Sequence, residues 1–259
     1  MRLAHSEKQP DGESASRKPG IYLLPNLLTT SALFAGFYGI VAAINGNFGI
    51  AAIAILIAMF FDGIDGRVAR LTNTQSEFGA QYDSLADMIS FGLAPSLIMY
   101  EWALFKFGKI GWLIAFVYAA STALRLARFN ANSGDSDNPV LFVGLPSPAA
   151  AAVVAASVWV GVGFGLQNSV GWSFFCAFTV AFTSLLMVSE LPYLTFKDIN
   201  LQGKVPFVAI LSIVLIYVLV SLEPASVLLF CFWAYLLSGV AKYLWDFSLR
   251  KVFNKKEIP

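Results

Sequence analysis

Four aspartates form two pairs whose spacing matches the turn of a helix. Asp62 and Asp65 are three positions apart, and Asp83 and Asp87 are four positions apart. Because helical residues three or four apart share a face, each pair should project from one side of its own helix. A turn between the two helices would bring the four carboxylates together. Such an all-oxygen set suits Mg²⁺ or Mn²⁺. The alternative, a solvated loop with scattered acids, does not explain the helical spacing.

Other residue types leave little room for a different chemistry. The one histidine, His5, lies in a polar N-terminal segment, and Cys176 and Cys231 lie inside apolar runs. The sequence therefore favours catalysis by carboxylates, hydroxyls and bound metal over a histidine base or a cysteine nucleophile.

Two glycines and an arginine accompany the aspartates. Gly66 lies one turn after Asp62, and Gly79 lies one turn before Asp83. Without a side chain, each allows a ligand to approach the helix backbone. Arg70 follows on roughly the same face as Asp62, where it could pair with a phosphate or an aspartate. This pattern suggests a diphosphate lying across two helices.

Composition predicts that these elements lie in a membrane. The chain has 259 residues, of which 58% are hydrophobic and 13% charged, and its mean hydropathy is +0.70. Soluble domains carry about 25% charged residues. The net charge of +1 argues against a nucleic-acid partner, whose phosphates would require a basic face. We therefore expect an all-α integral membrane protein in which lipid solvates much of the surface.

Apolar segments of about 20 residues are long enough to cross a bilayer. Both termini and the aspartates are expected on the cytoplasmic side, because that arrangement leaves only Lys106 and Lys109, of 17 lysines and arginines, outside. Residues 1–19 read as a flexible tail, and the localisation expected is the cytoplasmic (inner) membrane. Eight spans are predicted: Ile21 to Ile44, Phe48 to Leu71, Ser84 to Phe105, Ile110 to Ala127, Ser147 to Phe164, Trp172 to Ser189, Val205 to Leu222 and Ala225 to Trp245.

The aspartates and glycines together resemble the signature of the CDP-alcohol phosphotransferase family. The matching positions are Asp62-x2-Asp65-Gly66-x2-Ala69-Arg70-x8-Gly79-x3-Asp83-x3-Asp87. The resemblance implies a six-helix catalytic core whose four aspartates hold one or two divalent metal ions beside a CDP diphosphate. It also implies that Asp87 is the general base, and that Asp62, Asp65, Gly66, Ala69, Arg70, Gly79 and Asp83 form the metal and nucleotide pocket.

Three further stretches resemble the serine-using branch of that family. They are Pro25 to Thr29, Phe78 to Pro95, and Gly144-Leu145-Pro146-Ser147-Pro148. The resemblance implies residues 20–190 as the core, 191–248 as two added spans and 249–259 as a basic cytoplasmic tail. It also implies CDP-diacylglycerol and L-serine as substrates among membrane lipid. A homodimer is left open.

Several polar residues outside the signature have two readings. Asn26 and Thr29 are candidates to contact the cytidine, or to cap the first span. Arg125 and Arg128, three positions apart, are candidates to hold a carboxylate or phosphate of the acceptor, or to anchor their helix at the interface. The segment around Ser147 is a helix start, where proline is favoured.

The reaction expected is direct attack of an acceptor hydroxyl on the lipid-side phosphorus, with CMP leaving. A sister enzyme using glycerol 3-phosphate, inositol phosphate or choline is the nearest alternative, although a phosphorylated acceptor would call for a denser basic pocket. A divalent-metal transporter is a more distant alternative. It predicts broken helices in symmetric halves, and the sequence has no second copy of the aspartate motif.

Overall fold

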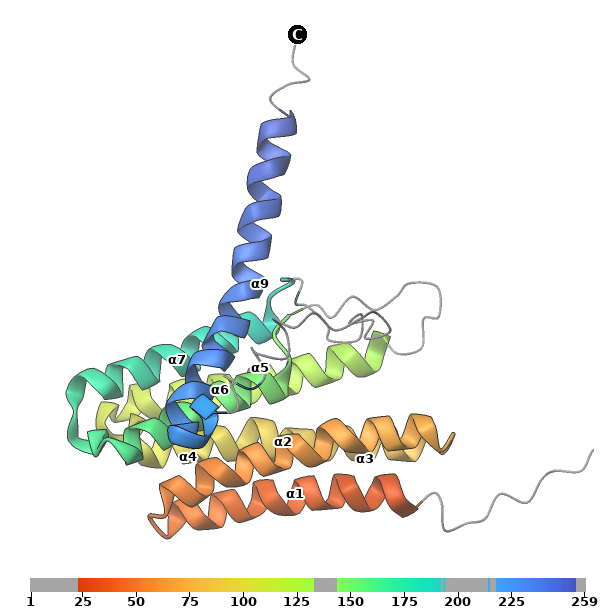
Figure 1. Ribbon diagram of the computed structural model, residues 1–259, viewed down its shortest axis with the longest axis horizontal. Helices are drawn as coiled ribbons and strands as arrows, with labels where there is room; N and C mark the ends of the chain where they lie inside the picture. Colours follow the sequence, from red (N-terminus) through yellow and green to blue (C-terminus); the bar gives the residue numbers. More distant parts are fainter. Residues whose placement is uncertain (1–22, 133–143, 192, 194–213, 215–217, 255–259) are drawn as a thin grey trace, which may run out of the picture.

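The computed structural model describes residues 23–132, 144–191, 193, 214 and 218–254. All regular secondary structure in these ranges is helical. Helices α1 to α7 form a bundle, and α9 begins at the bundle and rises steeply from it (Figure 1). The bounds are α1 (Leu23–Ile44), α2 (Phe48–Leu71), α3 (Glu77–Asp87), α4 (Ala94–Trp102), α5 (Lys109–Asn132), α6 (Ser147–Gly163), α7 (Val170–Val188) and α9 (Pro224–Asn254).

Most of the predicted spans coincide with a helix. The second predicted span has the same bounds as α2, and the first, fourth, fifth and sixth correspond to α1, α5, α6 and α7 within a few residues. The eighth corresponds to α9, which continues to Asn254 and so makes part of the predicted basic tail helical. The tail 1–19 and most of the span Val205 to Leu222 lie outside the described residues.

The third predicted span differs in form from a single membrane helix. The helix begins at Glu77 instead of Ser84, because the Ser76 hydroxyl caps it by accepting from the Gly79 amide at 3.0 Å. Directly after Asp87 the chain passes through a π-helix, η2 (Met88–Leu93), before α4. Such π-helical turns are frequent at functional sites.

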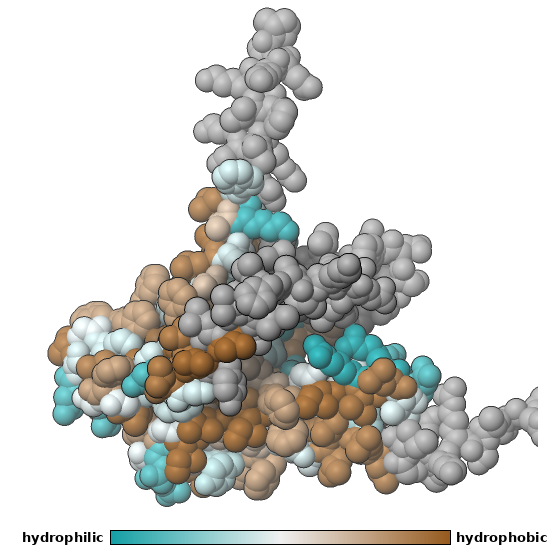
Figure 2. Space-filling view, in the orientation of Figure 1, coloured by the Kyte–Doolittle hydropathy of each residue, from teal (hydrophilic) through white to brown (hydrophobic). Residues whose placement is uncertain are grey.

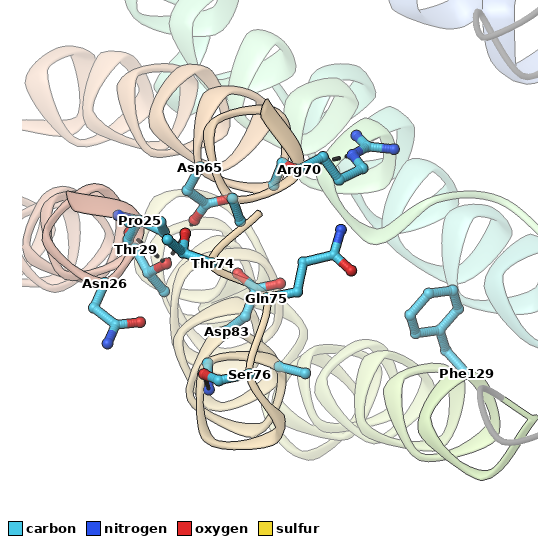
Figure 3. A pocket seen from close by; sticks show the side chains of 14 residues that line it. Pro25, Asn26, Thr29, Asp65, Arg70, Thr74, Gln75, Ser76, Asp83 and Phe129 are labelled. Atoms are coloured by element: carbon cyan, nitrogen blue, oxygen red, sulfur yellow. Dashed lines mark hydrogen bonds between the residues drawn. The ribbon is translucent and has the colours of Figure 1, made fainter. Parts of the chain in front are cut away.

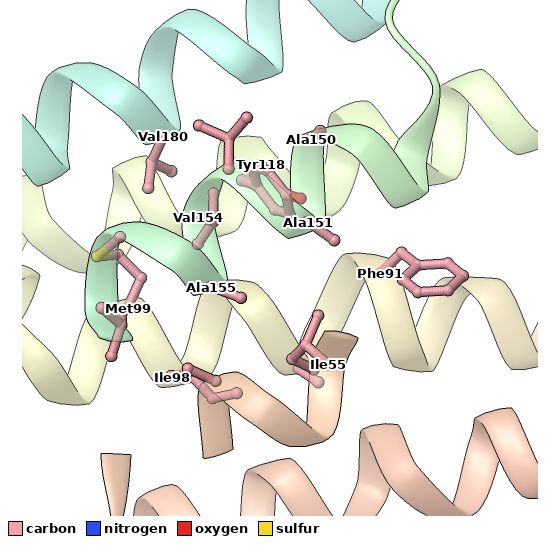
Figure 4. Close-up of a cluster of buried hydrophobic side chains, with 14 of the residues drawn as sticks. Ile55, Phe91, Ile98, Met99, Tyr118, Ala150, Ala151, Val154, Ala155 and Val180 are labelled. Carbon is pink, nitrogen blue, oxygen red and sulfur yellow. The ribbon is translucent and has the colours of Figure 1, made fainter. Parts of the chain in front are cut away.

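Small side chains allow the helices to approach closely. The core of the described bundle contains many alanines, and α6 is buried along most of its length. Figure 4 shows Ala155 of α6 on the side toward Ile55 of α2 and Ile98 of α4, and Val154 on the side toward Val180 of α7. Membrane helices depend on such small interfacial residues, because lipid gives no hydrophobic drive to associate.

The outer surface is apolar. Large side chains such as Phe34 of α1, Phe60 of α2 and Phe174 of α7 are more than 60% exposed. Hydrophobic colour covers much of the visible face in Figure 2, and hydrophilic colour gathers toward the ends of the bundle. Five helices (α1, α2, α5, α7 and α9) are long and apolar enough to cross a membrane, and α6 is shorter but equally apolar. The predicted class, an all-α integral membrane protein, is confirmed.

Candidate active site

Three of the four aspartates, one from α2 and two from α3, converge. Asp62 of α2 and Asp83 and Asp87 of α3 each offer a carboxylate oxygen within 4.8 Å of the others. The carboxyl groups of Asp62 and Asp87 lie close enough to interact directly, and two such groups can share a proton or a cation. Asp83 Oδ1 is buried and has no hydrogen-bond partner. Carboxylate oxygens in this arrangement fit a divalent cation.

Asp65 lies outside this group of three. Its side chain is buried, and Asp65 Oδ2 accepts a hydrogen bond from Thr29 Oγ1 of α1 at 2.7 Å. Asp65 still interacts electrostatically with Asp83, so it belongs to the same charged region. The helical spacing predicted that four carboxylates converge, whereas in the structure three cluster and the fourth, Asp65, is hydrogen-bonded to α1.

A cavity of about 370 Å³, lined by many polar side chains, adjoins the aspartates (Figure 3). Of the eight residues predicted to bind the nucleotide, all but Asp62 line it. The lining residues are Pro25, Asn26, Thr29, Asp65, Gly66, Ala69, Arg70, Thr74, Gln75, Ser76, Gly79, Ala80, Asp83 and Phe129. A Cβ added at Gly66 would meet nothing within 4 Å and would take up open space beside the helix. The glycine therefore leaves room for a ligand against the backbone of α2.

Figure 3 shows Thr29 and Asp65 on one side of this cavity and Arg70 and Phe129 on the other. Arg70 is exposed, and its Nε donates to the Gly66 carbonyl at 2.9 Å. This bond directs the guanidinium along the cavity wall, where it can meet an anion. Asn26 and Thr29 both lie inside α1, so the interpretation of these residues as helix caps is wrong.

The turn between α2 and α3 supplies lining residues that the sequence did not single out. Thr74, Gln75 and Ser76 follow Asn73, whose φ of +51° reverses the chain. They occupy the unspecified positions of the signature between Arg70 and Gly79, and neither their types nor their spacing marks a ligand. Phe129 reaches the cavity from α5, and its aromatic character gave no signal in so aromatic a chain.

The two arginines of α5 differ in position. Arg125 is partly buried and interacts electrostatically with Asp87 and Asp62, and its Nη1 donates to Ser147 Oγ at 2.8 Å. Arg125 Nε is buried and has no hydrogen-bond partner. Arg128, one turn further, is exposed. The structure thus brings Arg125 to the aspartates and leaves Arg128 at the surface.

A bundle of apolar helices with clustered carboxylates beside a cavity lined by many polar side chains defines an integral membrane protein with a candidate metal and ligand site. Within that class, the chain belongs to the CDP-alcohol phosphatidyltransferase family, whose model matches residues 22–185. The family resemblance drawn from the aspartate signature is confirmed. The metal-transporter alternative is wrong.

Curated relatives carry related names. The chain is 37% identical over 237 residues to the CDP-diacylglycerol–serine O-phosphatidyltransferase of Helicobacter pylori strain 26695, covering 92% of this chain and 97% of the relative. It is 37% identical over 183 residues to the enzyme of that name from Mycobacterium tuberculosis strain H37Rv, covering 68% and 62%. It is also 36% identical over 172 residues to the archaetidylserine synthase of Methanothermobacter thermautotrophicus, covering 66% and 69%.

Proposed function

We propose that this protein transfers a phosphatidyl group from CDP-diacylglycerol to the hydroxyl of L-serine, giving phosphatidylserine and CMP. The observation that carries the proposal is the contact between the 370 Å³ cavity and the aspartates, because Asp65 and Asp83 belong to both. A nucleotide in the cavity would place its diphosphate beside the carboxylates. The names of the relatives support serine as the acceptor.

The cavity holds the nucleotide half of the donor. Asn26 and Gln75 offer amide groups for the base or ribose, and Arg70 faces the diphosphate. Gly66 and Gly79 admit the ligand close to both helices. Thr29 belongs to this site through Asp65, since its hydroxyl holds that carboxylate in place.

The aspartates hold one or two divalent ions, Mg²⁺ or Mn²⁺. Asp62, Asp83 and Asp87 supply clustered oxygens, and Asp65 adds charge from the neighbouring position. When bound, the metal would neutralise the diphosphate and polarise the phosphorus. The unpartnered Asp83 Oδ1 fits this role, because a buried carboxylate oxygen without a donor is otherwise unfavourable.

The acceptor hydroxyl attacks the lipid-side phosphorus of the donor, and the bond from that phosphorus to the CMP oxygen breaks. Asp87 takes the hydroxyl proton as the new bond forms. Arg125 approaches Asp87 and Asp62 from α5. Its guanidinium can there bind the anionic group of the acceptor. Arg128, exposed one turn further along α5, contributes positive charge at the surface near Arg125.

The positions of arginines and lysines at the helix ends support an orientation of the protein in the membrane. Arg70 and Arg125 lie near the aspartate end of α2 and α5, whereas Lys109 begins α5 at its opposite end and Lys106 lies just before it. The positive-inside rule then faces the active site to the cytoplasm, in the inner membrane. We propose residues 20–190 as the catalytic core, with residues 191–248 as an addition and 249–259 as a cytoplasmic tail.

An acceptor panel tests the proposed function. Purified protein is supplied with labelled CDP-diacylglycerol and Mg²⁺ or Mn²⁺, and with serine, glycerol 3-phosphate, inositol phosphate or choline in separate reactions. We expect phosphatidylserine and an equal amount of CMP with serine alone. Efficient use of another alcohol in preference to serine would assign the chain to a sister activity.

A further inference from the structure

The segment Gly144-Leu145-Pro146-Ser147-Pro148 is fixed against the end of α7. The Gly144 amide donates to Leu191 O at 3.0 Å, and the Leu145 amide donates to Leu186 O at 2.9 Å. Gly144 has φ +90°, and a Cβ there would lie 2.6 Å from Met187 O. Glycine is therefore required at this position, and the segment has one well-defined path into α6.

This path places the Ser147 hydroxyl. Ser147 is the first residue of α6 and is fully buried, and Pro146 and Pro148 restrict the backbone on either side. Ser147 Oγ accepts the 2.8 Å hydrogen bond from Arg125 Nη1 of α5. A serine side chain has only one torsion angle before its oxygen. The fixed backbone therefore holds Ser147 Oγ in place before any ligand binds.

A second donor of the same guanidinium, Nε, makes no hydrogen bond. Arg125 Nε is buried without a partner, and the charged groups with which Arg125 interacts include Asp87 and Asp62. Buried donors of native proteins are almost always paired, so this one indicates a partner that binds from outside the chain. A guanidinium offers two parallel donors, a geometry that suits a carboxylate.

We propose that Ser147 is a positioning residue that holds Arg125 ready to bind the carboxylate of the acceptor amino acid. The inference rests on the proposed function, because it takes serine as the acceptor. Ser147 does not touch the substrate. It removes rotamer freedom from a long side chain that would otherwise be ordered only when the ligand binds. The glycine and prolines of the segment act by fixing Ser147.

Ser147→Ala tests the inference. We expect the KM for serine to rise about tenfold or more, the loss typical of a hydrogen bond to a charged group. The kcat and the KM for CDP-diacylglycerol should stay within about twofold of the wild-type values. Ser147→Thr keeps the hydroxyl and should restore much of the serine KM. A serine KM unchanged in Ser147→Ala would overturn the inference.

Ser157→Ala is the matched control. Ser157 is also fully buried on α6, but its hydroxyl donates to Val153 O at 2.8 Å within its own helix. This variant should keep the wild-type KM for serine. An equal rise in the control would mean that loss of any buried hydroxyl in α6 disturbs the site, and the positioning role would be wrong.

A double-mutant cycle with Arg125→Gln shows whether Ser147 acts through Arg125. In the Arg125→Gln background, adding Ser147→Ala should change serine binding little, because the two residues act as one unit. Binding is followed by the thermal shift that serine produces in the presence of CDP-diacylglycerol, so slow turnover does not block the measurement. Effects that multiply independently would contradict the inference. Failure of the wild-type protein to use serine would instead contradict the proposed function.

Discussion

Thr29 Oγ1 of α1 lies 2.7 Å from Asp65 Oδ2 of α2, and both side chains line the cavity beside the clustered aspartates. The bond separates the role of Asp65 from that of the other three carboxylates. Asp65 is held from α1, whereas Asp62, Asp83 and Asp87 face one another. The first helix thus takes part in the site and does not only pack against it.

Thr29→Val should weaken donor binding. The substitution keeps the shape of the side chain but removes the hydroxyl that donates to the buried Asp65 carboxylate, a loss of about 1.5–3 kcal/mol for a charged acceptor. We expect the KM for CDP-diacylglycerol to rise about tenfold or more, with the KM for serine little changed. Ser31→Ala is the control, since its hydroxyl donates to Leu27 O within α1. Equal donor KM values in the two variants would contradict the role of Thr29.

Metal removal should abolish CMP release. Without a cation, the carboxylates of Asp62, Asp83 and Asp87 bring no positive charge that could neutralise the diphosphate. We expect chelation to stop turnover and added Mg²⁺ or Mn²⁺ to restore it. Isothermal titration of the metal into the chelated protein gives a second readout that does not depend on activity. Full activity after exhaustive removal of metal would sink the metal assignment.

The sequence predicted where the site lies, but it did not predict the hydrogen bonds that join its helices. The helical spacing of the aspartates and the bounds of α2 followed from apolar length and periodicity. The bond between Thr29 and Asp65 did not, because it joins residues 36 positions apart and depends on how α1 packs. The bond between Arg125 and Ser147 has the same origin. The π-helix after Asp87 was also missed, since no residue pattern distinguishes it from an α-helix.

Gly36→Ala should destabilise the bundle. A Cβ at Gly36 would lie 2.5 Å from Ser90 Oγ and 2.7 Å from Ser90 Cα, so backbone must shift. We expect a loss of about 1–3 kcal/mol from this overpacking, seen as a lower Tm in detergent. Turnover should also fall, because Ser90 lies in the π-helix that follows Asp87. Gly49→Ala is the control, since its nearest contact, Val162 Cγ1 at 3.6 Å, is ordinary. A Tm as high as that of the control would contradict the close approach.

Cysteine labelling should show which side of the membrane the site faces. In a protein lacking Cys176 and Cys231, Glu77→Cys places an exposed thiol in the first turn of α3, next to the cavity. Asn47→Cys places one in the turn between α1 and α2, at the opposite end of the bundle. An impermeant reagent added to intact cells should label position 47 and spare position 77. The reverse result would overturn the proposed topology.

Asparagine variants should separate Asp87 from Asp65 and Asp83. Asp65 and Asp83 line the cavity, so Asp65→Asn and Asp83→Asn should weaken CDP-diacylglycerol binding as well as slow turnover. Asp87 is not among the lining residues, and we propose that it takes the acceptor proton. Asp87→Asn should therefore lower the chemical rate by about 10²–10⁴-fold while much of the donor affinity remains.

The measurement for this last comparison is donor binding and single-turnover rate for each variant at saturating metal. Saturation matters because Asp87 also lies among the clustered oxygens, and an amide is a poorer ligand than a carboxylate for a hard cation. A metal titration of Asp87→Asn shows whether enough cation has been added. If the rate at saturation then approached that of the wild type, Asp87 would act only as a metal ligand. A rate that stays low despite full metal and donor occupancy leaves proton transfer as the step that Asp87 serves, because metal and donor binding have then been accounted for.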